Sequence, residues 1–214
     1  MTTNIAIIGA GNVGGNLGAT FSKAGFPVHF GVKGDAKKDS QALLARCEKD
    51  AVIESVEAAA KWGDVVFVAV PAQVAVDIAR SLAPVLKDKI VVDCNNSLQW
   101  DNGPVWVAPP EGSLAQAIAR AVPGAKVVKG FNTFGAEFHA DPKHAGVPAN
   151  VFFASDDAAA KKTVSDIAKT AGYVPVDAGP LRNAGVLENL AILWIHLATV
   201  GGQGRDFTFS MTKK

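Results

Sequence analysis

The sequence predicts an α/β fold in which a mostly parallel sheet is covered by helices on both faces. Apolar runs of strand length, such as Ile5–Ile8 and the residues from Val65 to Val70 that follow Asp64, are continuous and do not alternate with polar residues, as in strands buried on both faces. Helical patterns follow these runs, as with Val13, Leu17 and Phe21, which are spaced four apart. Repeated strand–helix alternation of this kind predicts a doubly wound, Rossmann-type sheet.

Composition limits the possible environments and partners. The chain has 214 residues and 49% hydrophobic content, enough for a sizeable core, and its 21 Lys and Arg against 20 Asp and Glu give a net charge of +1. This balance disfavours nucleic acid or an anionic membrane as a partner. Two cysteines fit a reducing compartment, and the first strand begins too early to leave room for a signal peptide. We therefore expect a cytoplasmic protein.

A glycine cluster between the first strand and the first helix indicates dinucleotide binding. Gly9, Gly11 and Gly14 form a G-x-G-x-x-G motif, with Asn12 and Val13 inside it. The first glycine allows the tight turn, the second allows a pyrophosphate to approach the backbone, and the third allows close packing of helix against strand. The helix N-terminus then offers free N–H groups and a positive dipole end to the phosphates.

The end of the second strand, Val28–Val32, indicates which nicotinamide cofactor binds. An NAD-preferring site usually has an acidic residue here to hold the ribose hydroxyls, but this strand ends in Val32 and Lys33, and Asp35 follows only after Gly34. Lys33, with lysines 37 and 38 behind it, offers positive charge to a 2′-phosphate. The pattern favours NADP(H); the alternative is a solvated, lysine-rich start of a helix.

Polar residues follow several predicted strands, where ligands bind in parallel sheets. Pro71 ends one strand, Asn95 follows another, and Asn132 and Thr133 follow a third. Contacts from Asn95 to ribose or nicotinamide and ordinary turn chemistry are equally good interpretations.

The other expected elements continue the alternation of strands and helices, with one interruption. Residues 99–112 are expected to form a long loop, and Ser113 and Gln116 a capping box at the start of the next helix. Ser155 or Asp156 is expected to cap a later helix. The remaining expected elements are a helix over 39–48, a strand over 51–53, a helix over 56–62, strands over 89–94, 125–129, 150–155 and 173–177, and an apolar helix over 184–200.

Acid–base and metal chemistry have little support in the sequence. No spacing argues for a nucleophile–base arrangement or a metal site, and His139 and His144 are expected at the surface of a loop. We therefore assign no catalytic residue and no metal ligand. Hydride transfer between two stacked rings needs little acid–base help, because the cofactors carry the chemistry and the protein aligns them.

Several segments together resemble a known family. The chain resembles the NADP-dependent oxidoreductases that reduce the 8-hydroxy-5-deazaflavin coenzyme, and it is also similar to the oxidoreductase domain of the six-transmembrane metalloreductases. The matching segments are residues 7–14, 31–33, 66–71, 128–133, 177–181 and 187–190.

The resemblance implies a role for each matched position. Gly9 to Gly14 would hold the pyrophosphate, and Val32 and Lys33 stand where the deazaflavin enzymes have Ser-Arg for the 2′-phosphate. Val70 and Pro71 would flank the nicotinamide. Asn132 and Thr133 would face the stack of the two rings. The 131–134 loop is more similar to the metalloreductase version, which leaves the electron acceptor open.

These observations lead to one preferred function and two alternatives. We expect residues 1–180 to form an NADP-binding domain, and residues 181–214 to complete the second-substrate site or a homodimer interface. The expected activity is hydride transfer between NADP(H) and a deazaflavin or flavin coenzyme. The alternatives are an NADPH-dependent reductase of a small molecule or ferric complex, and a non-catalytic NADP(H)-sensing protein.

Overall fold

A six-stranded parallel sheet forms the centre of the computed structural model, which describes residues 3–34, 40–48, 51–144, 146–212 and 214. Its order is β3-β2-β1-β4-β5-β8, and every neighbouring pair is parallel. This order is that of doubly wound dinucleotide-binding sheets, so the predicted fold class is confirmed. The strands are β1 (Ile5–Ile8), β2 (Val28–Val32), β3 (Val52–Ser55), β4 (Val65–Val68), β5 (Ile90–Asp93) and β8 (Lys126–Lys129).

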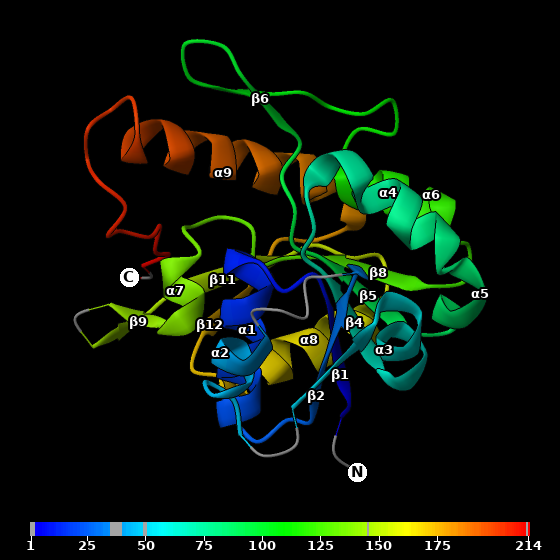
Figure 1. Ribbon diagram of the computed structural model, residues 1–214. Helices are drawn as coiled ribbons and strands as arrows, with labels where there is room; N and C mark the ends of the chain where they lie inside the picture. The colour runs from blue at the N-terminus through cyan, green and yellow to red at the C-terminus, as the bar shows by residue number, and fades with distance from the viewer. Residues whose placement is uncertain (1–2, 35–39, 49–50, 145, 213) are drawn as a thin grey trace.

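Helices cover both faces of this sheet (Figure 1). In β1, Ile5 and Ile7 belong to the apolar cluster on one face, while Ala6 and Ile8 belong to the cluster on the other, which explains why its sequence is continuously apolar. The first cluster includes residues of α1 (Asn12–Lys23) and α8 (Ala158–Thr170). The second includes residues of α3 (Val56–Trp62), α4 (Ala72–Ser81), α5 (Ala83–Leu86) and α6 (Leu114–Ala121).

Most of the remaining elements lie around the β8 side of the sheet or above its carboxyl edge, and α2 lies beside α1 (Figure 1). A parallel pair, β11 and β12, is joined to β8 by an antiparallel bridge between Lys129 and Ala154. The hairpin β6–β7 lies beside the long helix α9. Because Gly185 of α9 has no side chain, Trp106 of β7 can pack closely against the helix. Bounds are β6 (Leu98–Trp100), β7 (Pro104–Trp106), β9 (Lys143–His144), β10 (Val147–Pro148), β11 (Asn150–Phe153), β12 (Val174–Asp177), α2 (Ser40–Leu44), α7 (Glu137–Ala140), a 3-10 turn at Leu181–Asn183, and α9 (Ala184–Ala198).

Three local expectations were wrong. The expected loop over 99–112 contains the β6–β7 hairpin, whose turn uses positive φ at Asn102 (52°) and Gly103 (156°). The helix expected over 39–48 ends at Leu44, and its residue 39 lies outside the described residues. The N-cap of α8 is Asp157, whose carboxylate accepts from Ala160 N at 2.7 Å, so neither expected cap, Ser155 or Asp156, is the N-cap.

The N-cap of α6 is as predicted, with the Ser113 hydroxyl accepting from Gln116 N at 3.2 Å. Within the described residues, no helix combines the length and apolar character that crossing a bilayer requires.

Candidate functional site

A cavity of about 740 Å³ lies at the carboxyl edge of the sheet. It lies beside the neighbouring strands β1 and β4, where the strand order reverses: β2 and β3 extend to one side, and β5 and β8 to the other. This switch point is where doubly wound sheets bind dinucleotides. Nine predicted site residues line the cavity: Gly9, Gly11, Asn12, Val13, Val32, Lys33, Val70, Pro71 and Asn95. The prediction had omitted the apolar walls, which come from Val56, Val74, Ile78 and Cys94 among others.

Each glycine of the motif has a different geometric role. Gly9 has φ +103°, and a Cβ there would lie 2.3 Å from Ala69 O on the neighbouring strand end. A Cβ on Gly14 would lie 2.0 Å from Gly9 O, so Gly14 lets α1 pack against the turn and does not itself line the cavity. Gly11 faces open space. The surroundings of Gly9 and Gly14 therefore match the turn and helix-packing roles of the motif, and Gly11 leaves open space beside the cavity.

The N-terminus of α1 faces the cavity, and no side chain among the described residues caps its N–H groups. Its N-cap, Gly11, offers no side chain, and the first turn holds no acidic residue. The first N–H groups of a helix have no partner within it, and the helix dipole makes this end positive. This end of α1 therefore has the uncapped N–H groups and the positive dipole end that bind pyrophosphates in dinucleotide-binding folds.

The end of β2 supplies the charge of the site. Val32 is buried, Lys33 is exposed, and both line the cavity. Among the described lining residues, Lys33 alone is charged. Asp35 and lysines 37 and 38, on which the cofactor prediction also drew, lie outside the described residues.

Asn95 marks the opposite end of the cavity, and its amide orientation is determined by its neighbours. Its Nδ2 donates to Val68 O at 3.1 Å and to Asp93 Oδ1 at 2.9 Å, and both of these oxygens only accept. Both amide hydrogens are therefore used inside the protein. Asn95 can offer a ligand only its Oδ1, which accepts hydrogen bonds from groups such as a carboxamide or a ribose hydroxyl.

A fully buried ion group lies directly beneath Asn95. Lys129 on β8, Asp93 on β5 and Glu188 on α9 are each 0% exposed. Lys129 Nζ contacts Asp93 Oδ2 at 2.8 Å and Glu188 Oε1 at 3.1 Å, and it also donates to Asn95 O. Burial alone lowers the pKa of Lys129, but the two adjacent carboxylates outweigh it and raise that pKa above its ordinary value.

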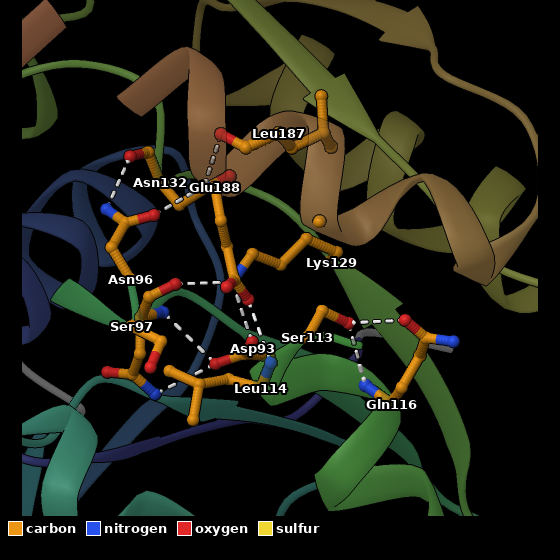
Figure 2. Close-up of polar contacts among 12 residues, drawn as sticks. Asp93, Asn96, Ser97, Ser113, Leu114, Gln116, Lys129, Asn132, Leu187 and Glu188 are labelled. Atoms are coloured by element: carbon orange, nitrogen blue, oxygen red, sulfur yellow. Dashed lines mark hydrogen bonds and ion pairs between the residues drawn. The ribbon is translucent and has the colours of Figure 1, made fainter. Parts of the chain in front are cut away.

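Glu188 extends this group to the hairpin and to α6. Figure 2 shows its side chain reaching from α9 toward Lys129 and Asp93. Its Oε1 accepts from Leu114 N at 2.9 Å, and its Oε2 accepts from Trp106 Nε1 at 2.8 Å. This group was not predicted from the sequence. The one feature of the sequence that points to this group is Lys129, a lysine at the end of the buried strand β8.

Asn132 and Thr133 are buried beside the cavity and do not line it. Asn132 Nδ2 donates to Asn96 Oδ1 at 2.8 Å and to Leu187 O at 3.1 Å (Figure 2). Its Oδ1 has no hydrogen-bond partner among the described residues. A buried acceptor of this kind is costly unless a donor completes it.

His139 corrects the expectation of a surface position. It is 0% exposed in α7, with Nε2 3.1 Å from Phe131 O and Nδ1 3.2 Å from the Tyr173 hydroxyl. Because a carbonyl only accepts, Nε2 carries the proton and Nδ1 accepts from Tyr173. Burial lowers the pKa of His139 to about 4, so the ring is neutral and structural. The side chain of His144 lies outside what is described.

The glycine-rich tail packs away from the cavity lining. Trp194 Nε1 donates to Phe207 O at 2.7 Å, and Arg205 forms a two-point pair with Glu137 at 2.7 and 3.1 Å. These contacts place the tail over α7 and the end of α9 (Figure 1). Within the described residues, no group of His, Cys, Asp and Glu is arranged to hold a metal ion.

Comparison with known proteins assigns the family. A family model described as NADP oxidoreductase, coenzyme F420-dependent, matches residues 4–97. The F420-dependent NADP reductase of Methanocaldococcus jannaschii is 30% identical over 167 residues, covering 76% of this chain and 74% of that protein. The chain belongs to the F420-dependent NADP oxidoreductase family. It is therefore an NAD(P)-dependent oxidoreductase, as predicted.

One further relative and one solved structure are similar to this member of the F420-dependent NADP oxidoreductase family. Metalloreductase STEAP3 of Rattus norvegicus is 29% identical over 189 residues, covering 88% of this chain and 36% of that protein, so the chain spans about a third of it. A crystal structure assigned to an F420-dependent NADP reductase of Arthrobacter sp. FB24 matches with a TM-score of 0.86 and 27% identity, covering 99% of this chain and 100% of that one. Both predicted resemblances, to the deazaflavin and metalloreductase families, are confirmed.

Proposed function

We propose that the protein transfers a hydride between NADP(H) and a deazaflavin or flavin coenzyme. The observation that carries this is the cavity at the switch point. It has an uncapped helix N-terminus at its centre, Lys33 at one end and the acceptor Oδ1 of Asn95 at the other. The name of the Methanocaldococcus relative, which pairs F420 with NADP, supports a deazaflavin as the second ring.

Each lining residue has a proposed role toward the dinucleotide. Gly9, Gly11, Asn12 and Val13 hold the pyrophosphate, with Gly14 supporting the turn from behind. Val32 and Lys33 hold the 2′-phosphate, because a cation at the β2 end attracts it and no carboxylate there repels it among the described residues.

The nicotinamide end is proposed to lie over the ends of β4 and β5. Val70 and Pro71 flank the ring, and Asn95 accepts a hydrogen bond from the cofactor. The bound nicotinamide supplies the hydride, and these residues orient it and exclude water. Asn132 and Thr133 lie one strand further on, after the end of β8, on the side proposed for the second coenzyme.

Cofactor preference tests the first half of this proposal. NADPH should bind more tightly than NADH, and Lys33→Ala should weaken NADPH binding by about 10- to 100-fold while leaving NADH binding unchanged, because a charged hydrogen bond is lost. Lys87→Ala is the matched control. It removes the same charge at an exposed site at the amino end of β5. Equal affinities of the wild-type protein for the two cofactors would contradict the NADP assignment.

Acceptor use tests the second half. NADPH oxidation should be measured anaerobically with a deazaflavin, with a flavin and with a ferric chelate. Turnover with the deazaflavin or flavin supports the proposal. Turnover with the ferric chelate alone supports a metalloreductase-type activity, which the similarity to STEAP3 keeps as the second candidate. NADPH binding without turnover on any acceptor supports the sensing protein.

We propose that residues 181–214 are a separate functional part that completes the second-substrate site or a homodimer interface, and the exposed face of α9 favours the interface. Val186 and Leu193 are seven residues apart on α9 and are 66% and 48% exposed, and Val200, 52% exposed, follows just beyond the end of the helix. Apolar residues at this spacing form one stripe along a helix and suit pairing with the same stripe of a second copy. Leu193→Glu should convert a dimer to a monomer in light scattering, and a wild-type monomer would contradict the assignment.

The free state of both cysteines, Cys47 and Cys94, supports our further proposal of a cytoplasmic location.

A further inference from the structure

The charge of the buried ion group can be derived from its hydrogen bonds. Lys129 uses all three of its N–H donors, on Asp93, Glu188 and Asn95 O. Every other hydrogen bond that the two carboxylates make is also accepted from an N–H group: Asn95 N and Nδ2 to Asp93, and Leu114 N and Trp106 Nε1 to Glu188. Neither carboxylate donates, as expected for ionised groups. Two negative charges and one positive charge leave the group at −1.

This charge lies at one particular end of the cavity. Asp93 is the last residue of β5, and its carboxylate binds both the backbone and the side chain of Asn95, which lines the cavity. Lys33 lies at the other end, beyond β1 and β4 in the sheet order. The cavity therefore has a cation at its proposed adenosine end and a buried net negative charge beneath its proposed nicotinamide end.

The two redox states of the cofactor differ in charge at that end. Loss of a hydride, one proton with two electrons, converts a neutral dihydronicotinamide into a cationic nicotinamide, and the second coenzyme takes up the hydride. A buried charge is weakly screened by salt and acts through a medium of lower effective dielectric constant than water.

We propose that the Lys129–Asp93–Glu188 group is an electrostatic specificity element that favours oxidised NADP⁺ over NADPH in the cavity. This inference rests on the proposed function, because it requires the nicotinamide at the β4–β5 end. By linkage, a site that favours the oxidised form makes bound NADPH a stronger hydride donor than free NADPH. The three residues are positioning and charge-setting groups, and none touches the cavity directly as Asn95 does.

The test removes one negative charge while keeping the shape of the group. Glu188→Gln alone would set a new amide N–H against Trp106 Nε1, so it is made together with Trp106→Phe, which deletes that donor. Trp106→Phe alone is the matched control that keeps the charge. Asp166→Asn is the second control, because it removes an exposed carboxylate on α8.

The dissociation constants of NADP⁺ and NADPH are measured for each variant by titration calorimetry. In the double variant, NADP⁺ affinity should fall relative to NADPH affinity by about 5- to 20-fold. This is the effect of one unit charge acting over about 10 to 15 Å at an effective dielectric constant of about 20. Both controls should keep the wild-type ratio. A merely structural role would weaken both nucleotides alike.

Each outcome decides something different. An unchanged ratio in a double variant that binds both nucleotides would overturn the inference and leave the proposed function standing. A wild-type protein that binds neither nucleotide would overturn the proposed function itself. If circular dichroism shows that the double variant does not fold, Asp93→Asn removes the same charge from the β5 side. It should shift the ratio in the same direction, and an unchanged ratio there is equally decisive.

Discussion

The sharpest prediction concerns two glycines of the same motif that the structure places in opposite surroundings. In Gly14→Ala the new methyl carbon would lie 2.0 Å from Gly9 O, about 1 Å closer than a real Cβ tolerates. The obstacle is backbone, so no side chain can rotate away, and either the turn or the start of α1 must move. In Gly11→Ala the new methyl carbon meets nothing within 4 Å.

The magnitudes follow from this difference. Overpacking costs about 1–3 kcal/mol and more when it displaces backbone, which outweighs the roughly 1 kcal/mol that alanine gains over glycine inside a helix. Gly14→Ala should therefore lower the free energy of unfolding by about 2 kcal/mol, or the melting temperature by about 4 to 8 °C. Gly11→Ala should stay within about 1 kcal/mol of wild type.

Binding separates the two glycines again. Gly11 lines the cavity, so its added methyl should weaken NADPH binding by at least about tenfold, because it stands where the pyrophosphate approaches the backbone. Chemical denaturation gives the stability and NADPH fluorescence gives the affinity. A Gly14→Ala protein as stable as wild type, or a Gly11→Ala protein with wild-type affinity, would refute this assignment of roles.

Three further predictions concern groups to which no direct contact with the dinucleotide has been assigned. Because His139 is held neutral with a pKa of about 4 against 6.5 when unfolded, the unfolded chain gains its proton first as pH falls. The free energy of unfolding should lose about 3 kcal/mol between pH 6.5 and 4 from this residue, and His139→Phe should lack that component in urea titrations across this range. Arg205→Ala breaks an exposed pair with Glu137 and should cost less than about 1 kcal/mol in urea denaturation; a larger loss would mean the tail is more tightly anchored than its contacts indicate. Burial raises the pKa of the Cys94 thiol far above its ordinary value, so a disulfide reagent should label half-buried Cys47 in the native protein and Cys94 only on unfolding.

The parts of the fold that were predicted correctly have local causes. The Gly9–Gly14 turn, the first helix and the strand Val28–Val32 each follow from residues adjacent in the chain, and the structure contains all three. Nine lining residues could be predicted because strand ends in a parallel sheet converge on one edge. The β6–β7 hairpin had a local signal in Asn102-Gly103, a dipeptide favoured in hairpin turns, although a loop was predicted there.

The missed features depend on residues far apart in the chain. Lys129 is buried only because Asp93, 36 residues earlier, and Glu188, 59 residues later, compensate its charge. No periodicity links these positions. His139 is similar, since its burial depends on Tyr173, 34 residues away. Apolar pattern can predict which face of a strand is buried, but it does not show which polar side chains are buried with it.

The buried ion group also constrains how this protein can change over generations. Removing one partner of a buried pair costs about 3–5 kcal/mol, a large share of the roughly 5–15 kcal/mol that keeps a domain folded. A single substitution that removes Lys129 leaves two buried carboxylates without a cation, and so passes through a poorly folded intermediate. These three positions, on β8, β5 and α9, should be inherited as a set, and a relative that has lost the lysine should also have lost both carboxylates.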